Sequence, residues 1–189
     1  MVLDANDQEV IEACRRGDWD AFRLLFEAHK DRVYSIALRY CGDESAAMDI
    51  AQETFLRLLS SIQDFRGGAS FESWLYRIVV NRCLDHQRRG RPLMPFLDGL
   101  LDIVSAPADS ALEELLRAEM AKDVQKMVGM LSPEQRIVVV LRYTEGLAYE
   151  EIAEILGCSV GTVASRLNRA HKALERRLSH LRVRGGGGV

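Results

Sequence analysis

Apolar residues recur every three to four positions along most of the chain, which is the spacing of one face of an α-helix. The segment 20–40 is typical and ends at Cys41-Gly42, a helix-stop signal. Its apolar positions are Phe22, Leu25, Phe26, Val33, Ile36, Ala37 and Tyr40. No long stretch alternates between apolar and polar residues, so the pattern predicts an all-α fold.

Start and stop residues divide the remaining pattern into further helices. Asp43 and Ser70 are side chains that cap helix N-termini. Ser132-Pro133-Glu134-Gln135 combines a capping serine, a proline at the first helical position and a glutamine that completes a capping box. We expect helices over 44–61, 71–89, 110–130, 133–145, 148–156 and 160–181.

Proline and glycine concentrate between the segments 71–89 and 110–130. This change in residue composition predicts two small helical domains, 1–90 and 111–182, joined by a flexible linker at 91–110. The linker also holds apolar residues, which leaves open a helical turn or a docking segment there. The glycine-rich end, 183–189, is expected to be a disordered tail.

Net charge alone argues against a nucleic-acid-binding protein, because the 189 residues sum to -3. The charge is unevenly distributed, however. Residues 65–92 carry +4 and residues 157–189 carry +6, within an otherwise acidic chain. Basic blocks attract phosphate, so the chain has two candidate nucleic-acid surfaces. Solvated helix ends rich in arginine are the alternative explanation.

The residues that carry metal or redox chemistry are scattered. The four cysteines form no CxxC pair and the four histidines do not cluster, which disfavours a zinc site, a disulfide framework or a bound cofactor. No nucleophile with a neighbouring base stands out, so catalysis is not expected. The acidic N-terminus differs from a signal peptide and no apolar run is long enough to span a bilayer, so we expect a cytoplasmic protein without membrane insertion.

Residues 149–167 have the pattern of a helix-turn-helix. Ala153 is small where two helices cross, Gly157 permits the positive φ of a tight turn, and Ser159 caps the second helix. Val163 and Leu167 would pack inward. The outward residues of this second helix would enter a DNA major groove. They are Thr162, Ser165, Arg166, Arg169 and Lys172.

A second candidate surface lies on the segment 65–89. Phe71, Trp74, Leu75 and Ile78 form its expected buried stripe. Arg77, Asn81, Asp85 and Arg88 form another stripe, whose residue types suit contacts to phosphates and base edges. The preceding loop, rich in glycine and aromatic residues, would hold an unstacked base.

The segment 46–59 predicts a protein-binding face. Its apolar side is expected to enter the core, whereas Asp49, Gln52, Glu53 and, unexpectedly, Leu56 point the other way. A lone leucine among carboxylates is usually incidental, but it also suits a partner with basic and apolar groups.

In this order, "DIAQETFLRLL", "FRGGASFESWLYRIVVNRCLDHQRR" and "LSPEQRIVVVLRYTEGLAYEEIAEILGCSVGTVASRLNRAHKAL" resemble the extracytoplasmic-function (ECF) sigma factors of the sigma-70 family. The resemblance implies a sigma region 2 helical bundle at 1–90 and a sigma region 4 helix-turn-helix at 111–182. It also implies an alternative sigma factor that binds core RNA polymerase and directs promoter-specific transcription initiation, and a cognate anti-sigma factor.

The resemblance also distributes roles among the candidate residues. Core polymerase binding falls to Asp49, Gln52, Glu53 and Leu56. Recognition and melting of the minus-ten element fall to Arg66, Arg77, Asn81, Arg82 and Arg88. Recognition of the minus-thirty-five element falls to the helix that carries Thr162 to Lys172. The alternative function is a stand-alone helix-turn-helix repressor or activator, with the first domain as a sensor.

Overall fold

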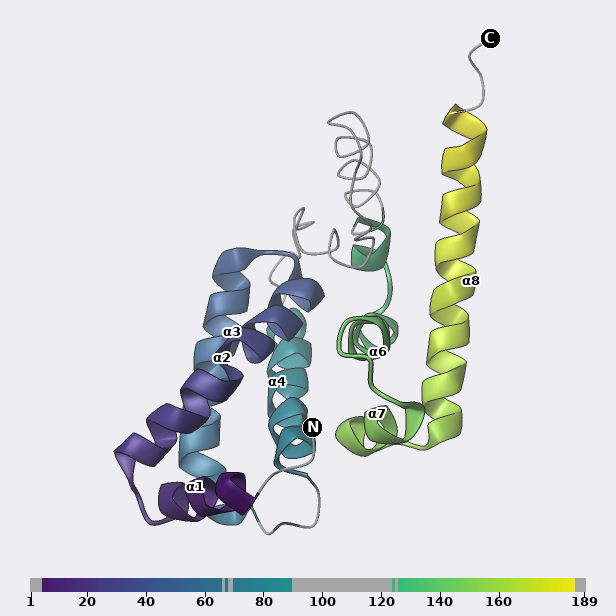
Figure 1. Cartoon of the computed structure of the whole chain (residues 1–189). Coiled ribbons are helices and arrows are strands. Elements are labelled where there is room, and N and C mark those ends of the chain that lie inside the picture. Colours follow the sequence, from purple (N-terminus) through teal and green to yellow (C-terminus); the bar gives the residue numbers. More distant parts are fainter. Residues whose placement is uncertain (1–4, 66, 68–69, 90–123, 125, 186–189) are drawn as a thin grey trace, which may run out of the picture.

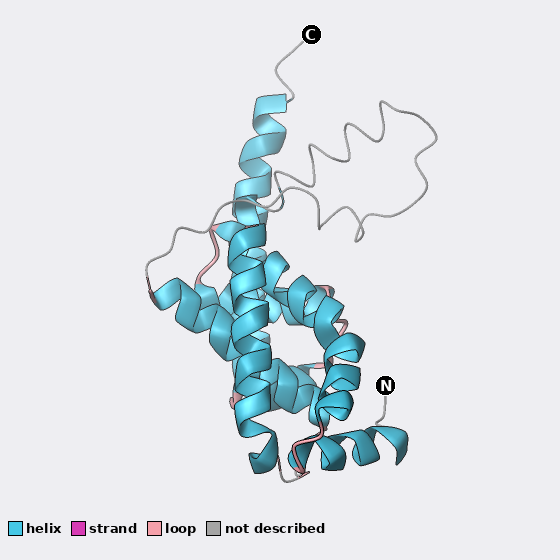
Figure 2. Ribbon diagram, turned by 90° about the vertical axis from the view of Figure 1, so that its left-hand side faces the viewer, coloured by secondary structure: helices cyan, strands magenta, loops and turns pink. Residues whose placement is uncertain are grey.

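The computed structural model describes residues 5–65, 67, 70–89, 124 and 126–185, and every regular element among them is a helix (Figures 1 and 2). The all-α class predicted by the periodicity is confirmed. The elements are α1 (Ala5–Arg15), α2 (Trp19–Cys41), α3 (Glu44–Ser61), a 3-10 turn η1 (Ile62–Asp64), α4 (Phe71–Arg88), α6 (Pro133–Tyr143), α7 (Tyr149–Leu156) and α8 (Val160–Gly185). The linker expected at 91–110, and most of the helix expected over 110–130, lie outside the described residues.

The helix ends use the capping side chains that the sequence marked. Asp43 accepts a hydrogen bond from the Ala46 backbone N–H at 2.7 Å, and Ser70 accepts one from Ser73 at 3.0 Å. Ser132 and Gln135 form the reciprocal capping box at 3.3 and 3.4 Å. These bonds satisfy backbone donors that the first helical turn leaves unpaired, so each boundary is set locally.

Two boundaries differ from expectation. Helix α1 precedes the first helix that the periodicity delimited. Helix α8 runs to Gly185, so the disordered tail expected at 183–189 is wrong for its first three residues. The C-terminal end of α8 projects beyond the helices packed at its other end (Figures 1 and 2).

Helices α1–α4, here called the N-terminal unit, enclose an apolar core in which α2 packs against α3 and α4. Residues from all three helices are almost fully excluded from solvent. They include Val33, Ile36, Tyr40, Ile50, Leu58, Phe71, Leu75 and Val79. The core fixes the rotation of α3 and α4, so their remaining faces are directed outward.

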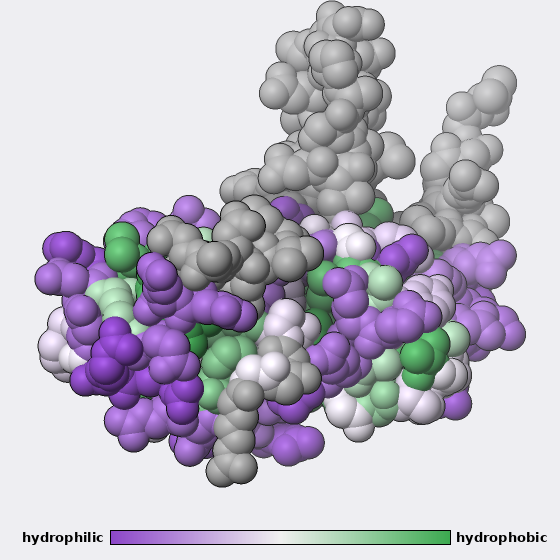
Figure 3. Space-filling view, turned by 60° about the horizontal axis from the view of Figure 1, so that its bottom comes forward, coloured by the Kyte–Doolittle hydropathy of each residue, from purple (hydrophilic) through white to green (hydrophobic). Residues whose placement is uncertain are grey.

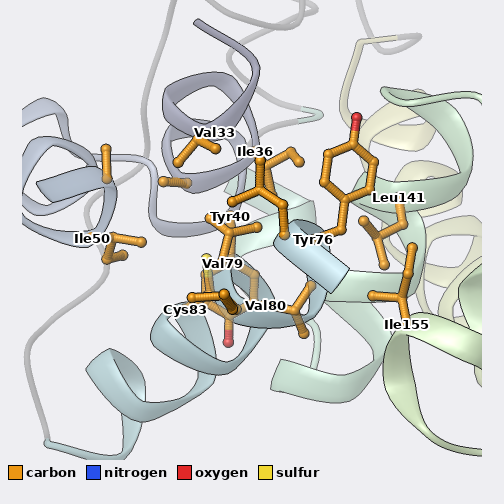
Figure 4. Close-up of a cluster of buried hydrophobic side chains, with 14 of the residues drawn as sticks. Val33, Ile36, Tyr40, Ile50, Tyr76, Val79, Val80, Cys83, Leu141 and Ile155 are labelled. Atoms are coloured by element: carbon orange, nitrogen blue, oxygen red, sulfur yellow. The ribbon is translucent and has the colours of Figure 1, made fainter. Parts of the chain in front are cut away.

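Residues 124–185, here called the C-terminal unit, pack directly against the first unit. Helix α7 contacts α4, and α6 contacts α2. Leu141 and Ile155 of the second unit join Tyr76 and Val80 of the first in one buried cluster (Figure 4). The two helical modules inferred from the sequence therefore share a continuous core.

Candidate nucleic-acid and protein interfaces

Helices α7 and α8 form the helix-turn-helix. Gly157 ends α7 in the left-handed region with φ of 61°, and Ser159 accepts a hydrogen bond from the Thr162 backbone N–H at 3.1 Å. Val163 and Leu167 are buried against the first helix. Ala148, at the start of α7, has no capping oxygen of its own, but its N–H donates to the Glu151 carboxylate at 2.6 Å.

The five candidate DNA contacts on α8 differ in exposure. Arg169 and Lys172 are exposed, whereas Thr162, Ser165 and Arg166 are half-buried. The Ser165 hydroxyl donates to the Thr162 carbonyl oxygen at 2.9 Å. The helix therefore presents cationic side chains over its second to fourth turns and small hydroxyl side chains near its N-terminus, which suits insertion of that end into a groove.

Helix α4 carries the second candidate surface. Arg77, Asn81 and Arg88 are exposed and Arg82 is half-buried, whereas Arg66 lies outside the described residues. The Arg77 guanidinium is engaged, because its Nη2 donates to the backbone carbonyl oxygen of Glu154 in α7 at 2.7 Å. The structure thus places the candidate contacts on one helix, but it brings one of them against the other unit.

Carboxylates surround the arginines at the C-terminal half of α4. Arg82 lies 3.5 Å from Asp85 and 3.8 Å from Glu53, and Arg88 lies 3.7 Å from Asp85. Arg89 also pairs with Glu53, at 3.3 Å. These partly exposed pairs are weak in water, so a phosphate can replace a carboxylate partner at modest cost.

The aromatic residues before α4 and in its first turn form a cluster. The rings of Phe65, Phe71 and Trp74 lie within 6.0 Å of one another, centre to centre. Phe71 is buried and Trp74 is half-buried. Trp74 was expected in the core, and the structure leaves it half-buried at the edge of the core.

An apolar groove of about 700 Å³ lies between α2 and α3. Gln52 and Leu56, two of the four residues predicted to bind polymerase, line it. The Leu56 side chain is 61% exposed. The sequence analysis missed the rest of its apolar lining, which consists of Phe22, Phe26 and Tyr34 of α2 and Met48 and Phe55 of α3. Phe22 and Phe26 are four residues apart among the apolar positions of the predicted helix 20–40, and this spacing fits a groove wall as well as a core.

The other two predicted polymerase contacts lie elsewhere on α3. Asp49 is exposed but does not line the groove, and Glu53 is directed toward α4, where it pairs with Arg82 and Arg89. The structure therefore brings Gln52 and Leu56 together at the groove and separates Glu53 from them. Figure 3 shows another aspect of the surface, on which apolar patches interrupt a mainly hydrophilic face.

Within the described part of the chain, no group of three or more His, Cys, Asp or Glu side chains has the geometry to hold a metal ion. None of the helices described is long and apolar enough to cross a bilayer.

Comparison with known proteins matches both units to one family. Residues 25–92 match the model of sigma-70 region 2, and residues 121–174 match that of sigma-70 region 4. The RNA polymerase sigma-H factor of Pseudomonas aeruginosa is 34% identical over 191 residues, which cover 96% of this chain and 98% of the relative. The ECF RNA polymerase sigma factor SigW of Bacillus subtilis is 35% identical, over 90% of this chain and 96% of the relative.

A solved structure shares the arrangement of helices. CnrH, in complex with the cytosolic domain of CnrY, superimposes with a TM-score of 0.66 at 25% identity and covers 92% of this chain and 97% of its own. With this coverage, the likeness extends over both units. The chain belongs to the ECF sigma factors of the sigma-70 family.

Proposed function

We propose that the chain binds core RNA polymerase through the α2–α3 groove and reads a bipartite promoter with α4 and α8. The observation that carries this function is the match to polymerase sigma factors over nearly the whole length of both chains. A stand-alone helix-turn-helix regulator would need only the C-terminal unit. The match of the N-terminal unit to sigma-70 region 2 therefore favours the sigma factor.

The groove supports polymerase binding because it combines exposed apolar surface with charge. Leu56 and Met48 are each 61% exposed at its walls, and Lys30, Asp31 and Gln52 supply polar groups beside them. An apolar anchor within a polar rim is the usual composition of a protein interface. We assign Leu56 as its centre, Gln52 as a rim contact, and Asp49 and Glu53 as charges that orient the polymerase.

The two cationic helices support promoter recognition. Arg77, Asn81, Arg82 and Arg88 of α4, together with Arg66 before it, would contact the minus-ten element. Thr162, Ser165, Arg166, Arg169 and Lys172 of α8 would contact the minus-thirty-five element as duplex. Melting needs no chemical step in this picture, because unpaired bases held by α4 and the aromatic cluster shift the duplex equilibrium.

We assign core polymerase binding and minus-ten recognition to residues 1–90, and minus-thirty-five recognition to residues 111–182. The linker at 91–110 joins them. The family is regulatory, and we infer no catalytic step, cofactor or metal for this chain. A cytoplasmic location follows from a role on the transcription machinery. A cognate anti-sigma factor is a further expected partner, and the solved structure of CnrH in complex with the cytosolic domain of CnrY supports a protein partner of this kind.

Run-off transcription with purified core polymerase tests the proposal directly. Promoter-specific transcripts are expected only when both the chain and the core enzyme are present. Genomic fragments selected by the reconstituted enzyme would supply the template, since the promoter sequence is unknown. Tight duplex binding by the chain alone, without polymerase association in gel filtration, would establish the stand-alone regulator instead.

A further inference from the structure

Glu53 of α3 lies between two arginines at the C-terminal end of α4. Its Oε1 accepts a hydrogen bond from Nη1 of Arg89 at 3.3 Å, and its Oε2 lies 3.8 Å from Nη1 of Arg82. The two arginines are seven residues apart, close to two helical turns, which places them on the same side of α4. Two guanidinium groups thus converge on one carboxylate, and we call this pair of arginines the arginine seat.

One donor of the arginine seat is left without a partner. Nε of Arg82 is shielded from water and has no hydrogen-bond partner among the described residues. An arginine presents its N–H donors in a planar fork, and carboxylates and phosphates both bind that fork through two oxygens. A backbone phosphate also carries a single negative charge over two free oxygens. The Glu53 carboxylate therefore occupies a place that suits a phosphate.

The exposure of the groups favours an exchange of the carboxylate for a phosphate. The Glu53 side chain is 44% exposed, so it can return to water at little cost. Arg82 is more enclosed, at 28% exposed, and its Nη2 lies 3.5 Å from Asp85. Asp85 would keep the Arg82 guanidinium in position after Glu53 has left. The arginine seat is thus preorganised for a second anion.

Glu53 also belongs to the face of α3 that is proposed to bind polymerase. It follows Gln52, which lines the α2–α3 groove, and it precedes the exposed Leu56 by three residues, just under one helical turn. A polymerase cation beside the groove would draw the Glu53 carboxylate away from α4. The polymerase and the arginine seat therefore compete for one side chain.

We propose that the arginine seat is a binding site for a DNA backbone phosphate and that Glu53 couples this site to polymerase docking. Polymerase withdraws Glu53 from Arg82 and Arg89, and the phosphate takes its place. This inference rests on the proposed function, because it concerns the polymerase face of α3 and the DNA face of α4. It adds Arg89 to the DNA contacts. Because linkage is reciprocal, loss of the arginine seat should strengthen polymerase binding.

Two variants test the two sides of the Glu53 contact. Glu53→Gln removes the anion from the arginine seat, and Glu44→Gln is its control, because Glu44 is an exposed carboxylate in the first turn of the same helix. Arg89→Gln removes one side of the seat. Its control is Arg16→Gln, since Arg16 is exposed between α1 and α2 and does not line the groove. Circular dichroism and thermal melting establish that each full-length variant folds.

The first measurement is the affinity of the free chain for an abasic strand, which has the phosphates of single-stranded DNA but no bases. Glu53→Gln should bind this strand about two- to fivefold more tightly than Glu44→Gln, because the seat no longer contains its own anion. In the Glu53→Gln background, Arg89→Gln should cancel most of this gain. It should also lower the slope of log K against log salt concentration by about 0.7, the contribution of one phosphate contact on a single strand.

The second measurement is the affinity of the chain for core polymerase in the absence of DNA. Arg89→Gln should bind about two- to fivefold more tightly than Arg16→Gln, because Glu53 is then freed from one of its two cations. Glu53→Gln should bind more weakly than the wild type. Combining Glu53→Gln with Arg89→Gln should remove the gain, since the carboxylate that transmits it is absent.

Equal affinity of Glu53→Gln and Glu44→Gln for the abasic strand would overturn the phosphate site. Equal affinity of Arg89→Gln and Arg16→Gln for core polymerase would overturn the coupling. If the wild type itself did not bind core polymerase, the proposed function would be refuted and the coupling with it. The abasic-strand data would still decide whether the arginine seat takes a phosphate.

Discussion

The guanidinium of Arg136 in α6 donates a hydrogen bond to the backbone carbonyl oxygen of Tyr40 in α2 over 3.3 Å, and it lies 5.3 Å from the centre of the Tyr40 ring. Its other donors reach the carbonyl oxygens of Val128, Gly129 and Leu131. Burial lowers the pKa of Arg136, yet an arginine stays charged at neutral pH. The charge is therefore stabilised by carbonyl groups from both units, at the C-terminal end of α2 and in the segment just before α6.

Replacement of Arg136 by methionine should lower the free energy of unfolding by about 3 kcal/mol, since several buried carbonyl groups lose their donors. Urea unfolding followed by circular dichroism measures this loss. Arg23→Met, at an exposed position of α2, should change stability by less than about 0.5 kcal/mol. Equal stability of the two variants would contradict the structural role of Arg136.

Leu56→Asp should abolish association with core polymerase, because a carboxylate would be desolvated at the centre of the proposed interface. Leu24→Asp is the matched control, since Leu24 is 60% exposed on α2 but does not line the groove. Gel filtration with purified core enzyme measures both. Retained binding by Leu56→Asp would move the polymerase contact away from the groove.

Arg166→Ala and Asn81→Ala should separate the two recognition steps. The Arg166 change is expected to weaken binding of the upstream duplex element about tenfold or more, because a bidentate base contact contributes about 1–3 kcal/mol. The Asn81 change should leave that binding intact and reduce open-complex formation, scored by permanganate reactivity of unpaired thymines. Loss of helical circular dichroism in either variant would show a structural role instead.

The salt dependence of duplex binding should identify phosphate contacts on α8. Each of the substitutions Arg169→Ala and Lys172→Ala is expected to lower the slope of log K against log salt concentration by about 1. Fluorescence anisotropy between 50 and 200 mM salt, chosen as a convenient window, measures the slope. An unchanged slope would place these two side chains away from DNA.

The four thiols should react at two distinct rates. Burial raises the pKa of Cys14, Cys41 and Cys83, whereas Cys158 is half-buried at the turn of the helix-turn-helix. A raised pKa leaves less thiolate at a given pH, and the thiolate is the reacting species. At pH 8 a disulfide reagent should modify Cys158 first, with the other three following only after unfolding. Mass mapping of the labelled peptides identifies which cysteine reacts first. Labelling of any other cysteine before Cys158 would contradict the prediction.

The helix boundaries and the helix-turn-helix were predictable because their causes are local. Caps such as Asp43 and Ser132, and the turn at Gly157, act within a few residues. The groove was only half predictable. Leu56 stood out among carboxylates, but Phe22 and Phe26 have the spacing of core residues, and the sequence does not show that they line a groove between α2 and α3.

The contact between the two units was not predictable from periodicity. Tyr76 and Leu141 are apolar positions on separate helices, and nothing in their spacing says whether they face their own unit or the other one. Glu145 lies in a loop where a solvated carboxylate is the usual expectation. Its burial depends on Arg32, more than a hundred residues away in the chain. Such long-range pairing is a property of the assembled units and has no local pattern.

Two of the hydrogen bonds between the units, those of Arg136 to Tyr40 and of Arg77 to Glu154, end on main-chain oxygens. Every residue type supplies such an oxygen, so residues at the accepting positions can drift through evolution without loss of the bond. Paired substitutions across relatives would therefore not reveal these two contacts. Only the arginine end of each bond requires a particular side chain, so an arginine within an otherwise apolar stretch is the sequence feature that would mark such a contact.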